Sequence, residues 1–460
     1  MSDVVLTVEQ MRAAERAAMD AGTSEWELMQ RAGQGAARWV MRMAAGRDVT
    51  VLCGPGNNGG DGYVIADVLL RSGYAVQVIA PVEPKTETAC IARQGFGGVV
   101  EQDGIPAGHV VVDCLFGYGL AREVRVDFAK LLEKVAGSTC YKIAIDVPSA
   151  VESDSGRILG PLPAYDLTLA LGAWKRAHLL MPAMAAMGAR RLVDIGLDLD
   201  GSTERLSQWP AFAAPPADSH KYRRGLLAIL AGTMPGAPIL AAEAAMHAGA
   251  GYVKLVSENS HPDAPADLVI GSDLAGVLDD RRIAALLVGP GLGRDAAARD
   301  KLSAVLATGK PCVLDADALH LLVPDMVAGK DPAAVCLTPH EGELARLCEA
   351  FGVTAESKLT RAQGLHDATG LTVLAKGPDT ILVGRDGTRF FPAGSSWLST
   401  AGTGDVLAGI VASRLAVHGD PMRACEEGVW LHLEAARLAS PAFSASDLAR
   451  AVKPAMASFL

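Results

Sequence analysis

The amino-acid sequence predicts an α/β protein of two domains. Short apolar runs that suit buried strands alternate with stretches of helical apolar spacing, a pattern typical of parallel sheets covered on both faces. This alternation stops near residue 198 and resumes at Gly225, and the segment between contains Pro210, Pro215 and Pro216. The chain has 460 residues, which is too long for one ordinary core. We therefore expect an N-terminal domain over residues 1–205, a linker over 206–219 and a C-terminal domain over 220–460.

The expected elements follow one another in a regular order, and the two halves share no internal repeat. A capping box over residues 7–10 opens helical spacing over 11–42, which we expect to break near Gly22 and Gly33. Ligands bind at the carboxyl ends of the strands in such sheets, so the residues that follow the strands are the candidates for a site. Strands are expected over 48–53, 75–80, 109–113, 142–146, 167–171, 225–232, 284–289, 311–315 and 372–376, with helices over 63–72 and 237–248.

Composition excludes several classes of protein. The net charge is −10 and no Lys/Arg run occurs, which argues against a general nucleic-acid binder. No apolar stretch is long and uninterrupted enough to span a membrane, and the N-terminus does not have the pattern of a signal peptide. The eight cysteines form no C-x-x-C pair and the ten histidines show no zinc spacing, which predicts reduced, buried thiols. We expect a cytoplasmic homo-oligomer without nucleic-acid or membrane partners.

A Gly-rich loop over residues 399–405 runs into the apolar helical pattern of residues 406–411 and ends on Asp405. The first turn of a helix presents unpaired N–H groups, and glycines such as Gly404 let this backbone approach a phosphate closely. A carboxylate at this position would repel the anion, so it indicates a general base that deprotonates a hydroxyl attacking a phosphoryl group. The alternative is a helix cap. Lys376, which ends a predicted strand, offers a positive charge for phosphate and favours the catalytic interpretation.

A second Gly-rich loop, over residues 54–62, stands between a predicted strand and a predicted helix. This arrangement suits phosphate binding, but it lacks the G-x-G-x-x-G dinucleotide fingerprint. Asp113 and Asp146 follow two other strands, where each is equally consistent with a helix cap and with a functional carboxylate. Because these strand ends converge on one crevice in a doubly wound sheet, their oxygen atoms could form a site for a hard cation.

These motifs resemble, in order, those of the NAD(P)HX epimerase domain over the first two hundred residues. The resemblance rests on residues 28–33, the 57–62 loop, the motif 112–117 and the motif 145–149. It implies a Rossmann-like three-layer fold that interconverts the R and S forms of hydrated NADH or NADPH. It also implies that the substrate contacts Asn57, Asn58, Gly59, Gly60, Asp61, Gly117, Tyr118, Gly119, Leu120, Ala121, Arg122, Glu123 and Asp146, and that Asn58, Asp113 and Ser149 bind potassium. We expect Asp61 and Asp146 to be the groups that move the proton.

The second half resembles the ribokinase-like superfamily, and more specifically its ADP-dependent NAD(P)HX dehydratase domain, over residues 220–455. The motifs that carry this resemblance are 289–293, 314–319, 338–343 and 402–409. It implies that ADP, with Mg²⁺, phosphorylates the C6 hydroxyl of (6S)-NAD(P)HX and that phosphate is then eliminated. By resemblance Asp405 is the base. Lys376, Gly377, Pro378, Asp379, Thr380 and Gly404 would bind the nucleotide, and Ala237, Gly291 and His340, with Asp405, would contact the hydrated nicotinamide.

The sequence therefore predicts a bifunctional metabolite-repair enzyme whose substrates are NADHX, NADPHX and ADP. One alternative is a ribokinase-like small-molecule kinase with an appended domain. Another is an N-terminal half that only binds ligands, because Ala150 stands where the epimerase domain usually has Gly and Tyr118 where it usually has Thr. In the second half, Glu341 replaces a frequent Pro and Met234 a common aromatic residue.

Overall fold

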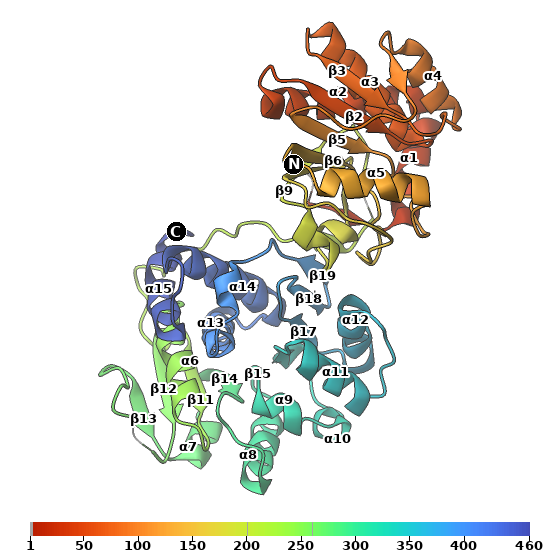
Figure 1. Ribbon diagram of the computed structural model, residues 1–460. Helices are drawn as coiled ribbons and strands as arrows, with labels where there is room; N and C mark the ends of the chain where they lie inside the picture. The colour runs from red at the N-terminus through yellow and green to blue at the C-terminus, as the bar shows by residue number, and fades with distance from the viewer. Residues whose placement is uncertain (1–2, 200, 260) are drawn as a thin grey trace. The chain divides into compact units, whose positions relative to one another are not determined.

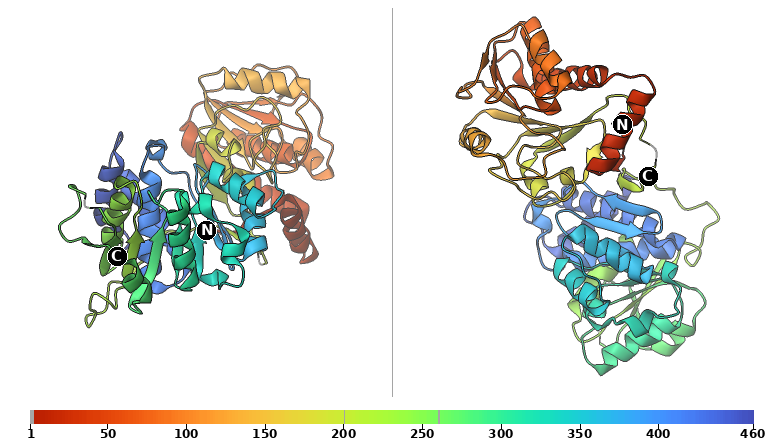
Figure 2. Two further views of the ribbon diagram at one scale, coloured as in Figure 1. Left: turned by 90° about the horizontal axis from the view of Figure 1, so that it is seen from below. Right: turned by 90° about the vertical axis from the view of Figure 1, so that its right-hand side faces the viewer.

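The structure is a computed structural model that describes residues 3–199, 201–259 and 261–460. The chain forms two compact units, Met1–Leu206 and Ser207–Leu460, and each is an α/β unit with its own sheet (Figure 1). The views in Figure 2 show that helices cover both faces of the sheet in each unit. No helix in the described part of the chain is long and apolar enough to span a membrane.

The first unit is built on a seven-stranded parallel sheet. Its elements are β1 (Val5–Leu6), α1 (Val8–Asp20), α2 (Glu25–Ala44), β2 (Val49–Cys53), α3 (Asn57–Arg71), β3 (Val76–Ile79), α4 (Glu87–Gly95), β4 (Val100–Glu101), β5 (Val110–Cys114), α5 (Val126–Ala136), β6 (Tyr141–Ile145), β7 (Leu167–Leu171), β8 (Trp174–Lys175), β9 (Ala189–Val193) and β10 (Glu204–Leu206). The strand order is β4-β3-β2-β5-β6-β7-β9, so the direction of winding reverses between β2 and β5. In doubly wound sheets, ligands bind at this reversal.

Two helix predictions in this unit are wrong. The chain does break at Gly22, where φ is +100°, but Gly33 lies inside α2. A Cβ on Gly33 would lie 2.6 Å from Val64, so this glycine serves the close packing of α2 on α3. Helix α3 begins at Asn57, six residues before the predicted start, because the Gly-rich loop itself forms the first helical turns.

The second unit contains a mixed sheet and a larger set of helices. Its elements are β11 (Leu226–Leu230), α6 (Gly236–His247), β12 (Tyr252–Val256), β13 (Val269–Gly271), α7 (Leu274–Asp279), β14 (Ile283–Val288), α8 (Ala296–Ala307), β15 (Cys312–Leu314), α9 (Asp317–Leu321), α10 (Pro324–Val327), β16 (Val335–Leu337), α11 (Glu341–Ala350), α12 (Lys358–Thr369), β17 (Thr372–Ala375), β18 (Ile381–Gly384), β19 (Gly387–Phe390), α13 (Thr403–His418), α14 (Pro421–Leu438) and α15 (Ala445–Ala457). The strand order is β19-β18-β17-β16-β15-β14-β11-β12-β13, and only the pairs that involve β18 are antiparallel.

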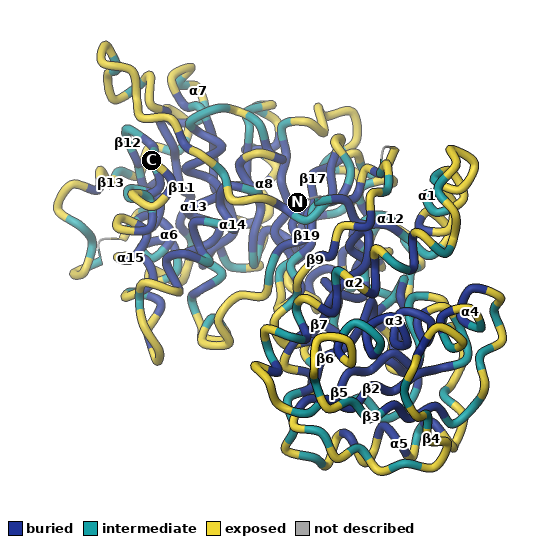
Figure 3. Tube along the Cα trace, turned by 90° about the horizontal axis from the view of Figure 1, so that it is seen from above, coloured by how far each residue is buried: buried dark blue, intermediate teal, exposed yellow. Residues whose placement is uncertain are grey.

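Helices α6, α13, α14 and α15 pack against one another on one face of this sheet (Figure 1). Helix α13 is buried along almost its whole length, and most of it is coloured dark blue in Figure 3. Residues 207–219 form no helix or strand and pack on this same unit. Trp209 and Phe212 both stack on Phe459, with ring centroids 4.3 Å and 4.9 Å from that of Phe459, respectively.

The cysteines only partly follow the sequence prediction. All eight are free, and six of them are buried. Cys90 and Cys140 are half-buried, because they lie outside the central strands, at α4 and before β6.

Candidate active sites

A cavity of about 730 Å³ opens in the first unit at the carboxyl ends of β2, β5 and β6, where the winding of the sheet reverses. Residues from α3, from the loop after β5 and from the end of β6 line it together with side chains of α1 and α2. The predicted substrate residues that line it are Asn57, Asn58, Asp61, Gly117, Tyr118, Gly119, Leu120, Ala121, Arg122 and Asp146.

Gly59, Gly60 and Glu123 were also predicted to contact substrate, but they are not among the residues that line this cavity. The two glycines serve close packing instead. A Cβ on Gly59 would lie 1.8 Å from the carbonyl oxygen of Gly54, and one on Gly60 would lie 2.4 Å from Met29. Gly59 thus holds the first turn of α3 against the residue that follows β2, and Gly60 lets α3 pack closely on α2.

Asp146 is held by contacts from several segments. Its Oδ2 accepts a hydrogen bond from the backbone N–H of Tyr118 at 2.8 Å, and its Oδ1 lies 2.5 Å from the ammonium of Lys175. Its φ of +66° lies in the left-handed region, which is unusual for a residue other than glycine. A strained backbone held by its surroundings is typical of functional sites.

Asp61 and Glu15 face the same cavity as Asp146. Burial raises the pKa of Asp61 well above its usual range, and the nearby Asp146 and Glu15 carboxylates raise it further. Burial also raises the pKa of Glu15, against the effect of the hydrogen bond that Tyr118 Oη donates to it at 2.6 Å. The cavity therefore combines an ion-paired carboxylate, Asp146, with two carboxyls that hold their protons more tightly than usual.

Of the three predicted potassium ligands, Asn58 lines this cavity, whereas Asp113 and Ser149 are not among its lining residues. Asn58 Oδ1 is buried and has no hydrogen-bond partner in the described parts of the chain, while its Nδ2 donates to Ile145 O at 3.3 Å. Asp113 accepts four hydrogen bonds, from Leu115 N, Ser149 N, Ser149 Oγ and Tyr165 Oη. An unpartnered amide oxygen beside a set of oxygen donors fits a hard monovalent cation.

In the second unit, Asp405 lies in the first turn of α13, which begins after Gly402 at φ +91°. The left-handed conformation at Gly402 turns the chain sharply into the helix. Burial and the nearby carboxylate of Asp315 raise the pKa of Asp405 to about 6, although the Lys376 ammonium acts in the opposite direction. A carboxylate with this pKa can accept a proton near neutral pH and can also release it.

Lys376 connects the end of β17 to the start of α13. Its Nζ lies 2.6 Å from Asp315 Oδ1, and a Cβ on Gly404 would lie 3.4 Å from it. Asp315 Oδ1 also accepts a hydrogen bond from Thr338 Oγ1 at 2.7 Å. Burial opposes the charge on Lys376, but Asp315 and Glu343 outweigh this effect and raise the pKa of its ammonium. A positive charge therefore stands directly beside the turn that is predicted to bind phosphate.

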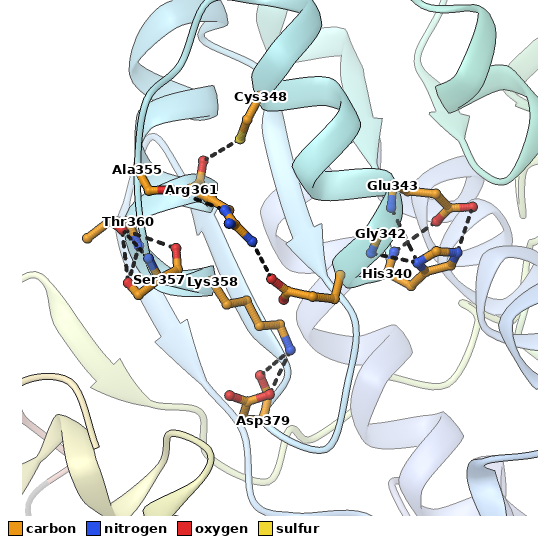
Figure 4. Close-up of polar contacts among 11 residues, drawn as sticks. His340, Gly342, Glu343, Cys348, Ala355, Ser357, Lys358, Thr360, Arg361 and Asp379 are labelled. Carbon is orange, nitrogen blue, oxygen red and sulfur yellow. Dashed lines mark hydrogen bonds and ion pairs between the residues drawn. The ribbon is translucent and has the colours of Figure 1, made fainter. Parts of the chain in front are cut away.

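The other predicted nucleotide residues follow Lys376 in a tight turn. Asp379 is paired with Lys358 of α12, whose Nζ lies 2.8 Å from both the carboxylate and the carbonyl oxygen of Asp379 (Figure 4). Thr380 Oγ1 donates to Gly377 O at 2.8 Å. A Cβ on Gly377 would lie 2.4 Å from Lys358 Nζ, so the turn around Pro378 requires a glycine there.

The predicted nicotinamide residues are placed at the start of α6, after β14 and at the start of α11. Ala237 lies in the first turn of α6, and Gly291 approaches the same segment, since Met234 N donates to Gly291 O at 3.1 Å. His340 caps α11: its Nδ1 accepts from the N–H groups of Gly342 and Glu343 (Figure 4). This exposed histidine therefore has a structural role as a helix cap, which is the alternative to a role in binding the nicotinamide.

Comparison with known proteins decides between the alternatives. A family described as NAD(P)H-hydrate dehydratase matches residues 227–456, and one described as YjeF-related protein N-terminus matches residues 25–177. The chain is 34% identical over 432 residues to the bifunctional NAD(P)H-hydrate repair enzyme Nnr of Mycobacterium tuberculosis, a match that covers 89% of this chain and 88% of that relative. The chain belongs to the family of bifunctional NAD(P)H-hydrate repair enzymes.

Other members of the family are similar over nearly the whole chain. The repair enzyme Nnr of Escherichia coli strain K12 is 33% identical over 478 residues, which cover 96% of this chain and 91% of that relative. A solved ribokinase-like superfamily protein of Enterococcus faecalis V583 is 24% identical, with a TM-score of 0.51, over 57% of this chain and 98% of that chain. The predicted resemblance to this repair family and the ribokinase-like fold are therefore confirmed.

Two departures from the family pattern have a visible effect. Ala150 adopts φ +72°, a conformation that favours glycine, which explains why glycine is usual there. Tyr118 extends to Glu15 of α1, so its ring closes one side of the cavity.

Several site residues carried no motif. Glu15, Tyr165, Lys175 and Lys358 lie on segments that the repair-family motifs do not include, and Asp315 was part of a motif without an assigned role. For Lys175 a signal existed, because it follows the carboxyl end of β7 by four residues.

Proposed function

We propose that the chain repairs hydrated nicotinamide nucleotides by two activities. The first unit epimerises R and S NAD(P)HX. The second dehydrates (6S)-NAD(P)HX at the expense of ADP and releases NAD(P)H, AMP and phosphate. Membership in the bifunctional repair family supports both activities, and the observation that supports the dehydration chemistry is the buried Asp405 carboxylate beside Lys376 at the N-terminus of α13.

For dehydration, Asp405 would accept the proton of the C6 hydroxyl while the hydroxyl oxygen attacks the β-phosphoryl group of ADP. Lys376 and the N–H groups of the first turn of α13 would stabilise the charge on the phosphoryl oxygens. The C6–O bond then breaks, the oxygen leaves with the phosphate, and a ring proton is lost. This order is favourable because phosphate is a far better leaving group than hydroxide.

Magnesium would enter with the nucleotide. In the described parts of the chain, no three His, Cys, Asp or Glu side chains are placed to hold a metal ion by themselves. This fits Mg²⁺, which binds through substrate phosphates and water with one or two carboxylates. Asp405 and Asp315, which both interact with Lys376, are the carboxylates that we propose to hold the ion, which would neutralise phosphate charge.

For epimerisation, Asp61 and Asp146 would move the proton in the cavity of the first unit, and Asn58, Asp113 and Ser149 would hold potassium. The unpartnered Asn58 Oδ1 supports the potassium proposal. Such an ion would stabilise the loop ends that carry Asn58 and Ser149, and would provide positive charge near the bound substrate.

The test is the return of the near-UV absorbance of reduced nicotinamide from an equilibrated R/S mixture of NADHX, with ADP, ATP or no nucleotide. We expect complete recovery with ADP, faster than spontaneous epimerisation allows. Recovery that stalls with the R epimer left would reduce the first unit to a binding module. No recovery with either nucleotide would reject the dehydratase, and a retained phosphorylated product would indicate a kinase.

A further inference from the structure

Lys175 is a fully buried lysine in the wall of the first cavity. Its ammonium lies 2.5 Å from Asp146 Oδ1 and 2.6 Å from the carbonyl oxygen of Leu171, and 5.5 Å from the centre of the Tyr118 ring. Removing an ammonium from water is costly unless the charge is paired and hydrogen-bonded. These contacts satisfy that condition, and all of them are with residues that line the cavity.

The segment that carries Lys175 also holds the backbone of Asp146. His178 Nε2 lies 2.6 Å from Asp146 O, and His178 Nδ1 accepts a hydrogen bond from Lys175 N at 2.9 Å. Burial lowers the pKa of His178 to about 4, so near neutral pH the ring is uncharged and Nε2–H donates to the carbonyl. Residues 171–178 therefore contact both the side chain and the main chain of Asp146, whose φ is +66°.

The charged and titratable groups that face Asp146 come from every surrounding element: Glu15 of α1, Asp61 of α3, Tyr118 after β5, Lys175 of β8 and His178 after it. Two of these are carboxyls, which oppose a negative charge on Asp146. Among these described groups, Lys175 supplies the positive charge that compensates for it. Without this partner, the Asp146 carboxylate would lose the contact that orients its Oδ1.

We propose that Lys175 is a positioning residue for epimerisation, which holds the Asp146 carboxylate in place through Oδ1, with Oδ2 turned toward the loop at Tyr118 and the substrate. This inference rests on the proposed epimerase function. Lys175 acts through Asp146 and does not itself exchange a proton with the substrate. Consequently, its effect on the rate must disappear once the Asp146 carboxylate has been removed.

A double-mutant cycle on the full chain tests this dependence. Wild type, Lys175→Met, Asp146→Asn and the double variant are given (R)-NADHX without ADP, and formation of the S epimer is followed by chromatography. We expect each single variant to lower kcat about 100-fold or more with KM changed less than threefold. The double variant should match Asp146→Asn within about threefold. Losses that multiply, or a Lys175→Met rate within threefold of wild type, would overturn the proposal.

Folding is checked independently. The S epimer with ADP measures dehydration in every variant and reports on the second unit, and melting curves report on the first. Lys142→Met is the matched control, because the ammonium of this buried lysine of the same sheet donates to the carbonyl oxygens of Ser138 and Cys140 and Lys142 does not line the cavity. This variant should keep the epimerisation rate. If Lys175→Met unfolds, the double variant is still compared with Asp146→Asn, since neither protein contains the Asp146 carboxylate. Rates that differ by more than about threefold between these two would overturn the proposal. A wild-type chain that does not epimerise would reject the proposed function itself.

Discussion

Asp405 is a carboxyl group whose surroundings oppose its charge. Burial and Asp315 favour its protonated form, and the single nearby cation that opposes them among the described contacts, Lys376, is itself paired with Asp315. The result is a carboxyl group with a pKa of about 6, as the proposed base requires, whereas Asp146 of the first unit is paired with a lysine. The two aspartates that we propose as proton-transfer groups therefore lie in different electrostatic environments.

The pH dependence of dehydration follows from this environment. A protonated Asp405 cannot accept the hydroxyl proton, so activity requires the ionised form, which declines as the pH falls through the pKa of about 6. We expect kcat/KM for (6S)-NADHX to fall about tenfold per pH unit below 6 and to level off above 7. A profile that stays flat from pH 5 to 8 would contradict this role.

Replacing Asp405 should separate activity from stability. Asp405→Asn should lower the dehydration kcat by about 10²- to 10⁴-fold, because the base is lost, and leave epimerisation unchanged.

The same variant tests the effect of Asp405 on stability. The pKa of Asp405 is higher in the folded than in the unfolded state, so its contribution to wild-type stability declines as the pH rises from about 4 to 6. The variant should thus melt higher than wild type at pH 8 but not below pH 4. Asp386→Asn, at an exposed aspartate of the same unit, serves as control.

At the scale of elements, both sites are assembled where a strand ends and a helix begins. In the first unit, close contact between backbones sets the position of α3: Gly54 N donates to Cys114 O, and Gly59 lies against Gly54. In the second unit, α11 and α13 begin beside the residues predicted to contact nucleotide and nicotinamide. Small changes at these helix starts should therefore affect function strongly.

Gly59 offers the sharpest test in the first unit. Gly59→Ala would place a Cβ 1.8 Å from Gly54 O, and because backbone cannot move aside easily, α3 must shift. We expect a loss of about 3 kcal/mol or more in the unfolding free energy of this unit, together with loss of epimerisation. Gly56→Ala is the stability control, since a Cβ at Gly56 meets nothing within 4 Å. Equal melting temperatures for the two variants would contradict the packing role.

His340 can be tested as a cap and as a substrate residue at once. His340→Ala removes the acceptor for Gly342 N and Glu343 N and should cost about 1 kcal/mol, while His340→Asn should retain a cap. If His340 also contacts the hydrated nicotinamide, both variants should raise KM for (6S)-NADHX. An unchanged KM in His340→Asn would leave the histidine with its structural role alone.

At the scale of the whole molecule, each unit has a hydrophobic core of its own. The chemistry also consists of two separate reactions, because hydration of NAD(P)H yields both epimers and only the S epimer is dehydrated. A fused chain supplies the two activities in equal amounts. The proline-rich segment that the sequence suggests as a linker contributes Trp209 and Phe212 to the packing of the second unit.

Two truncated proteins test this division. Residues 207–460 alone should dehydrate (6S)-NADHX and leave the R epimer, whereas residues 1–206 alone should epimerise. Residues 220–460 should be less stable than 207–460 by about 3–5 kcal/mol, because the stacks of Trp209 and Phe212 on Phe459 are lost. Melting curves of the two C-terminal fragments measure this difference. Equal stability would show that residues 207–219 are a simple linker.

The sequence by itself determined what its local patterns encode. Apolar runs located the nine predicted strands within a few residues but missed others, among them β12, β16 and β18. The motifs around Asn57, Asp146 and Asp405 identified the family and the ends of the sheets where we expect the sites. Local pattern could not reveal that Gly33 packs on Val64 within a continuous helix. Only the tertiary structure decided which distant residues meet: Lys175 with Asp146, and Lys376 with Asp315. The physical reason is that pairing, burial and pKa depend on groups brought together by strand order, and periodicity along the chain carries no record of those neighbours.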